Sequence, residues 1–117
     1  MVLFGDESSF GLGAALRAIP GFSATFLFEA TEIAESRLVL DAIGLGEATV
    51  IERAPDDAHL AAIAAEMSSL AAGGANFVLT GKARSIQQVS RVLKTVGVGS
   101  SRVKAKAYWA PGKVGLD

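Results

Sequence analysis

"VLFGDESSFGLGAALRAIPG", residues 2–21, joins an uninterrupted apolar run, a polar turn with glycine and a segment with helical periodicity. Val2–Phe4 predicts a buried strand, because a continuous apolar run is typical of a strand covered on both faces. Ser8–Ala18 carries apolar side chains at helical spacing, and Pro20-Gly21 ends it. This stretch therefore predicts a strand that leads through a short turn into a helix.

The same unit recurs along the rest of the chain. Further strands are predicted at Thr25–Phe28, Ala48–Ile51, Phe77–Leu79 and Val103–Trp109, and helices at Glu32–Ile43, from Pro55-Asp56-Asp57 to Gly73, and at Arg84–Val96. Parallel neighbours need crossover connections, and helices usually supply them. Five strands that alternate with four helices therefore predict an α/β fold with a five-stranded parallel sheet flanked by helices.

The predicted last strand differs from the others because polar and small apolar residues alternate along it. Such alternation is typical of a half-exposed edge strand. Tyr108 falls on the polar side of the alternation and Trp109 on the apolar side. We therefore expect Trp109 to pack inward and Tyr108 to face outward.

Composition excludes several classes of function. The chain has 117 residues, of which 50% are hydrophobic, as expected for one compact domain. Its 11 basic and 12 acidic residues leave no positive excess to bind a polyanion, so nucleic acid is not an expected partner. The chain has no cysteine and one histidine, which argues against thiolate or multi-histidine metal sites. We see no membrane span or signal peptide and expect a cytoplasmic location.

Ligands of open parallel sheets bind beyond the carboxyl ends of the strands. After the first predicted strand, residues 5–16 include Gly5, Gly11 and Gly13, but their spacing is not GxGxxG. Ser8 or Ser9 is positioned to cap the following helix, whose amides would then hold a phosphate. An ordinary turn with a serine cap explains the same residues.

The later turns supply further candidates. Glu29 follows the second strand, where many nucleotide-binding sheets use an acid for the ribose hydroxyls. Arg53 follows the third strand and suits a ribose 2′-phosphate, although a solvated surface arginine is the commoner case. "TGKARS", residues 80–85, follows the fourth strand but lacks the spacing of a P-loop. The lone His59 is expected at a surface or boundary position.

Two other classes fit less well. A receiver-type phosphorelay domain would use Asp6, Glu7 and Thr80, but no aspartate stands at the end of the third strand. A hydrolase would need a histidine near Ser8 or Ser9, and the pattern supplies none.

Three segments together resemble a known family: "LFGDESS" at 3–9, "VLTGKARSIQQVSRVLK" at 78–94 and "VKAKAYWAPGK" at 103–113. They are similar to the C-terminal half of siderophore-interacting proteins, ferric-siderophore reductases that resemble ferredoxin–NADP reductases. The resemblance implies that residues 1–117 form an NAD(P)H-binding domain excised from a two-domain flavoprotein. An upstream barrel would then hold FAD, and a ferric siderophore would be the substrate.

The resemblance also assigns roles to residues. Gly5, Asp6, Glu7 and Ser8 match the turn that faces the nicotinamide and pyrophosphate, Arg53 matches a position suited to the 2′-phosphate, and Gly81 matches a turn beside the nicotinamide. Two departures are that family members often carry an acid where Lys82 stands and an arginine where Ala110 stands. Tyr108 would lie near the domain boundary, or serve packing alone. The predicted cofactor-binding set is Gly5, Asp6, Glu7, Ser8, Ser9, Arg53, Gly81, Lys82, Arg84 and Tyr108.

The protein's expected part is to place the nucleotide, so no catalytic side chain is predicted. NADPH and NADH both remain open as the cofactor. The alternative is a stand-alone nucleotide-sensing or docking domain of the same fold without redox activity. A flavin-binding barrel encoded upstream of Val2 would favour the reductase.

Overall fold

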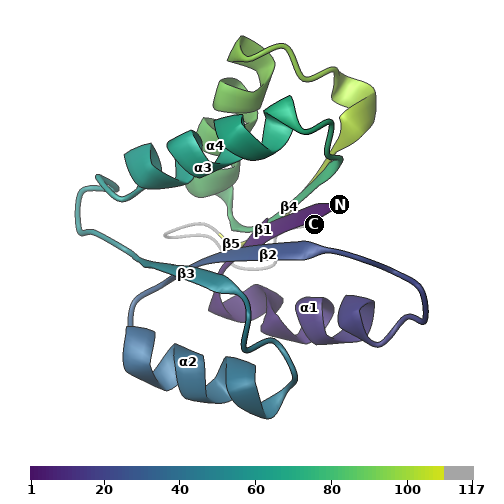
Figure 1. Ribbon diagram of the computed structural model, residues 1–117. Helices are drawn as coiled ribbons and strands as arrows, with labels where there is room; N and C mark the ends of the chain where they lie inside the picture. Colours follow the sequence, from purple (N-terminus) through teal and green to yellow (C-terminus); the bar gives the residue numbers. More distant parts are fainter. Residues whose placement is uncertain (110–117) are drawn as a thin grey trace.

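Five parallel strands form one sheet in the computed structural model, which describes residues 1–109 (Figure 1). They are β1 (Val2–Gly5), β2 (Thr25–Ala30), β3 (Thr49–Glu52), β4 (Phe77–Lys82) and β5 (Val103–Trp109). Their order across the sheet is β3-β2-β1-β4-β5, and every neighbouring pair is parallel. The predicted α/β fold with a five-stranded parallel sheet is confirmed.

Four helices cover the two faces of the sheet. They are α1 (Phe10–Arg17), α2 (Ile33–Ala42), α3 (Leu60–Ala72) and α4 (Ala83–Thr95), with short 3-10 turns η1 (Glu7–Ser9) and η2 (Ser100–Arg102). Helices α1 and α2 lie on one face, and α3 and α4 lie on the other (Figure 1). No helix in residues 1–109 is long and apolar enough to cross a membrane.

Each face of the sheet has its own apolar core, and β1 contributes to both. Leu3 packs into the core under α1 and α2, together with Phe28 and Leu40. The next residue, Phe4, packs into the core under α3 and α4 with Met67. A strand that is buried on both faces must be apolar at every position, which explains the continuous run at the start of the chain.

Three strands are longer than predicted, and β1 exceeds its prediction only by Gly5. β2 continues to Ala30, so Glu29 lies within the strand and not in the loop after it. β4 continues to Lys82 because β5 pairs with it through Gly81 and beyond. The predicted loop at residues 80–85 is therefore wrong: α4 begins at Ala83, directly after the strand.

The predicted start of α3 at Pro55-Asp56-Asp57 is also wrong, since the helix begins at Leu60. The Asp56 carboxylate accepts a hydrogen bond from the Ala58 amide, and Asp57 has a φ of 62°. That left-handed backbone cannot belong to an α-helix, and Asp is among the residues that tolerate it. Residues 55–59 form a turn that carries Asp57 and His59 toward the carboxyl end of the sheet.

Candidate functional site

The strand order reverses at β1, whose partners β2 and β4 lead away in opposite directions. In open α/β sheets this is the place where ligands bind, beyond the carboxyl ends of the strands. Asp6 follows β1 there, and Lys82 ends β4. Arg53 follows β3, and Trp109 ends β5. These four side chains and Glu7 form one cluster of charged and aromatic groups, which we call the switch-point cluster.

Asp6 is the buried anchor of the switch-point cluster, with an exposed fraction of 1%. Its carboxylate accepts hydrogen bonds from the Ser8 amide at 2.9 Å, from the Ser8 hydroxyl and from Trp109 Nε1 at 2.8 Å. Asp6 thus caps η1 and ties the end of β5 to the end of β1. Ser9 occupies the N-cap position of α1, as predicted for Ser8 or Ser9, but its side chain makes no capping hydrogen bond to that helix. The side-chain cap is made by Asp6 and belongs to the preceding turn η1.

Ser9 makes hydrogen bonds inside the protein and is not accessible to a ligand. It is fully buried, and its Oγ lies 2.7 Å from Oγ1 of Thr80. Thr80 in turn donates to the carbonyl oxygen of Phe4 at 3.0 Å. Since the Thr80 proton is used in that bond, Ser9 is the donor to Thr80. This chain of hydroxyls joins η1, β4 and β1 beneath the switch-point cluster.

The glycines at the ends of β1 and β4 permit close internal packing. A Cβ on Gly5 would overlap Ser9 and lie 2.7 Å from Thr80 Oγ1. A Cβ on Gly81 would lie 2.9 Å from Cγ of Asp6, and Gly81 has a φ of 99°. Glycine is therefore required at both positions by this chain's own side chains.

Arg53 is at the centre of the switch-point cluster. Its Nη2 lies 3.0 Å from Oε1 of Glu7 and 3.7 Å from Oδ2 of Asp6, and its Nε lies 3.8 Å from Oε1 of Glu29. The side chain is 16% exposed. The alternative of a solvated surface arginine is thus wrong, since three carboxylates surround this guanidinium.

The ion pair shifts the pKa values of both partners. Burial alone would raise the pKa of Glu7, but hydrogen bonds from Arg53 and from the Thr31 amide outweigh it and hold this pKa below its ordinary value. Burial would lower the pKa of Arg53, but Glu7 and the other carboxylates raise it. Both groups are charged at neutral pH.

Glu29, which lies near Arg53, forms a buried hydrogen-bonded pair with His59. His59 Nε2 lies 2.6 Å from Oε1 of Glu29, and both side chains are almost fully buried, at 3% and 1% exposure. The Ala54 amide donates to Nδ1 of His59 at 3.0 Å, so Nε2 carries the proton and donates to Glu29. The prediction of a surface or boundary histidine is wrong, because the turn at residues 55–59 folds His59 inward.

Trp109 lies within the switch-point cluster. Its ring is 6.0 Å from Arg53 Cζ and 5.7 Å from Lys82 Nζ, both within the range of cation–π attraction. The pairing of β5 with β4 passes from Ala107 to Trp109 and omits Tyr108, which is 37% exposed. Tyr108 thus faces outward, as predicted. Trp109 is half-buried, but it packs against charged side chains and is not a member of either apolar core, since an irregularity in pairing ends the simple alternation.

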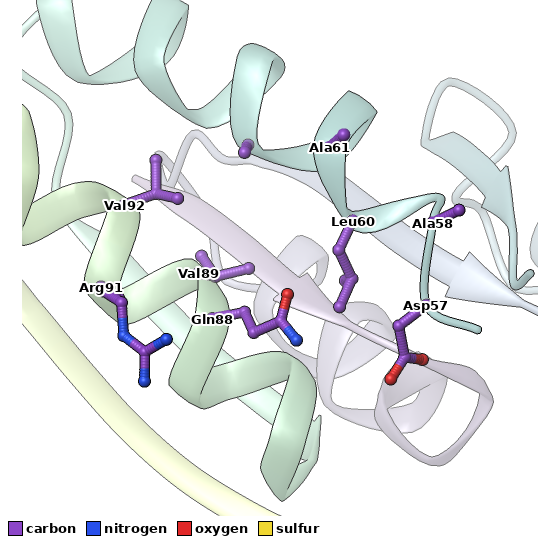
Figure 2. Close-up of a pocket in the computed structure, with 9 residues that line it drawn as sticks. Asp57, Ala58, Leu60, Ala61, Gln88, Val89, Arg91 and Val92 are labelled. Atoms are coloured by element: carbon purple, nitrogen blue, oxygen red, sulfur yellow. The ribbon is translucent and has the colours of Figure 1, made fainter.

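Asp57 connects the switch-point cluster to α3. It lies 3.7 Å from Lys82 Nζ and 3.2 Å from Arg84 Nε. It also stands at one end of a pocket of about 360 Å³ between α3 and α4, where Leu60 and Val89 line the walls (Figure 2). A second pocket, of about 280 Å³, lies beside Glu7 and α2.

A comparison with protein-family models indicates the family of this chain. A family model described as "siderophore-interacting protein" matches residues 1–112. The chain belongs to the siderophore-interacting protein family. No curated protein and no solved structure matches it.

The structure brings part of the predicted set together. Asp6, Glu7 and Arg53 contact one another, and Lys82 lies against Trp109. Arg84 is 66% exposed and contacts the switch-point cluster only through its ion pair with Asp57.

The sequence analysis missed three residues that belong to the site: Trp109, Asp57 and His59. For Trp109 the signal was present, because the predicted strand Val103–Trp109 ends at this residue, beyond which ligands of such sheets bind.

Proposed function

We propose that this siderophore-interacting domain is the pyridine-nucleotide half of a flavin-dependent ferric-siderophore reductase. It would bind NADH or NADPH at the carboxyl ends of β1 and β4 and present the nicotinamide to FAD held by another domain. The observation that carries the proposal is the switch-point cluster, in which residues from four strand ends meet where the sheet order reverses. Membership of the siderophore-interacting protein family supports the reductase context.

The N-terminus of α4 suits the pyrophosphate. Within residues 1–109, no side chain caps its first turn, so the amides there are available to an anion. Lys82 precedes the helix and adds a positive charge. Ser85 Oγ in the first turn is buried without a partner among the described residues. The η1 turn is less suitable, because the Asp6 carboxylate already occupies its amides.

The remaining residues would position the nicotinamide. When bound, the nicotinamide supplies the hydride and FAD accepts it. Trp109 offers a flat ring whose Nε1 is fixed by Asp6, so its orientation is set before the nucleotide arrives. Asp6 is held in turn by Ser8. The role of these side chains is orientation, which needs no proton transfer to any of them.

Backbone amide shifts during titration with NADH and NADPH test the binding step. We expect shifts at residues 5–9 and 81–85, and a roughly tenfold loss of affinity in Lys82→Ala, since one charge-assisted phosphate contact is removed. Lys94→Ala, in the last turn of α4, is the matched control. The absence of shifts at millimolar nucleotide would refute the proposal.

The redox step needs a partner and is tested in trans. A separately produced flavin-binding barrel of the same family should be reduced by NADH or NADPH faster when this chain is added. The Lys82→Ala variant should remove most of that acceleration. Nucleotide binding without any acceleration would support a sensing or docking domain instead.

A further inference from the structure

The three carboxylates around Arg53 differ in their access to a ligand. Asp6 and Glu29 are each 1% exposed. The Asp6 carboxylate accepts hydrogen bonds from Trp109 and Ser8, and Glu29 Oε1 accepts one from His59. Glu7 is 41% exposed. Of these three acids, Glu7 is therefore the one that a bound molecule can reach.

Glu7 also lies where dinucleotide-binding sheets place their ribose acid. Its Oε2 accepts from the Thr31 amide at 2.9 Å, immediately after β2 ends at Ala30. An acid at the end of the second strand accepts hydrogen bonds from the ribose hydroxyls in such sheets. Glu29, the acid that the sequence puts near this point, is turned toward His59 instead. Glu7 reaches the end of β2 from the turn after β1.

The charges around Glu7 disfavour a phosphate. The two Nη atoms of Arg53 face the two carboxylate oxygens of Glu7, at 3.4 and 3.0 Å, so the guanidinium is already neutralised. A 2′-phosphate carries up to two negative charges at pH 7. It would have to displace Glu7 and would then face Asp6 and Glu29, which are fixed. The pocket beside Glu7 also carries Glu32 and Glu35.

The neutral hydroxyls of a ribose are not repelled by these carboxylates. A ribose with free 2′- and 3′-hydroxyls donates to a carboxylate, and a hydrogen bond to a charged acceptor is stronger than one between neutral groups. We propose that Glu7 is the ribose-binding carboxylate of this site and that the site selects NADH over NADPH. Arg53 then acts as a positioning residue that holds Glu7 in place. This inference rests on the proposed nucleotide-binding function.

Calorimetric titration of the 117-residue chain with four compounds tests the selection. NADH and NADPH differ by the 2′-phosphate, and so do ADP-ribose and 2′-phospho-ADP-ribose, which lack the nicotinamide. We expect the compound without the phosphate to bind roughly tenfold tighter in both pairs, as like-charge juxtaposition predicts. Trp109, the sole tryptophan, gives a second readout of binding by fluorescence.

Glu7→Gln tests the residue itself, because it removes the charge and keeps the shape. We expect NADPH to bind roughly tenfold tighter than to wild type and NADH several-fold weaker, so that the preference is lost or reversed. Glu66→Gln makes the same charge change on the exposed face of α3 and should alter neither affinity. Circular dichroism establishes that both variants are folded.

The outcomes separate the inference from the proposed function. Equal or tighter binding of the phosphorylated compound to wild type overturns the selection while the nucleotide site stands. An unchanged preference in Glu7→Gln overturns the assignment to Glu7. If none of the four compounds binds, both the selection and the nucleotide-binding proposal are overturned.

Discussion

Glu29 and His59 are buried next to the switch-point cluster. The Glu29 carboxylate accepts its hydrogen bond from the His59 imidazole. In His59→Leu the buried carboxylate would lose this donor, and Glu29 Oε2 already has no partner among the described residues. We expect a loss of about 3 kcal/mol in the free energy of unfolding, because a buried carboxylate without a hydrogen-bond donor is costly. Arg53 Nε, 3.8 Å from Glu29 Oε1, lies too far away to replace that hydrogen bond. Urea unfolding followed by circular dichroism measures it.

The double variant Glu29→Leu/His59→Leu is the control for that prediction. Removing both partners eliminates the stranded carboxylate, so the double variant should be more stable than His59→Leu alone. If His59→Leu costs below about 0.5 kcal/mol, within the range of ordinary surface changes, the pair does not stabilise the fold.

The ion pair of Glu7 with Arg53 predicts a pH-dependent contribution to stability. The pKa of Glu7 is lowered in the folded protein from its ordinary value of 4.5. The contribution is therefore fully present above pH 4.5 and is lost as pH falls through the lowered pKa. Because the side chain is 41% exposed, we expect below about 1 kcal/mol.

The measurement is the difference in unfolding free energy between wild type and Glu7→Gln from pH 7 down to pH 3. The difference should be constant near neutrality and should vanish at the acid end. Glu66→Gln, which changes an exposed acid on α3, should show no comparable pH dependence. A difference that grows with acidity would contradict the predicted sign.

At the scale of elements, the sequence predicted each strand and helix but not all of their ends. The apolar run of β1 follows directly from burial on both faces, and periodicity alone locates α4. The end of β4 instead depends on its pairing with β5, which lies far along the chain. The start of α3 depends on the left-handed turn at Asp57, a conformation that composition does not reveal.

The same limit applies to the site. Topology alone predicts that residues following β1, β3 and β4 meet at one edge of the sheet. It does not predict that Glu29 turns toward His59 or that Trp109, and not Tyr108, joins Asp6. Those contacts depend on an inward-folded turn and on an irregular strand pairing, and single-sequence patterns carry no signal for either.

Gly81 allows a prediction about the end of β4. An alanine there would meet the Asp6 carboxylate at 2.9 Å and would have to keep a φ of 99°. We expect Gly81→Ala to cost about 3 kcal/mol, from backbone strain and from displacement of Asp6. Trp109 fluorescence should change as well, because its Nε1 bonds to that carboxylate.

Gly74→Ala separates strain from contact. Gly74 has a φ of 83°, but a Cβ there would meet nothing within 4 Å. This variant should cost about 1 kcal/mol and should leave the Trp109 fluorescence unchanged. Equal losses in the two variants would show that Gly81 is needed for its conformation alone.

At the scale of the whole molecule, β1 joins the two cores of the sheet. Leu3 belongs to the core under α1 and α2, and Phe4 belongs to the core under α3 and α4. Neither core can lose its contacts with β1 without disturbing the other. The chain should therefore unfold in one cooperative transition, as small single domains usually do.

Leu40→Ala and Met67→Ala test this coupling, because each truncates a fully buried side chain in a different core. Each should lower the free energy of unfolding by about 3 kcal/mol through lost burial and a residual cavity. Circular dichroism follows the unfolding of the helices on both faces of the sheet, whereas Trp109 fluorescence follows unfolding at the carboxyl end of β5. The two signals should give the same urea midpoint in either variant, since β1 transmits the loss of one core to the other. Separate midpoints in Leu40→Ala would mean that the α1–α2 face unfolds independently of the switch-point cluster.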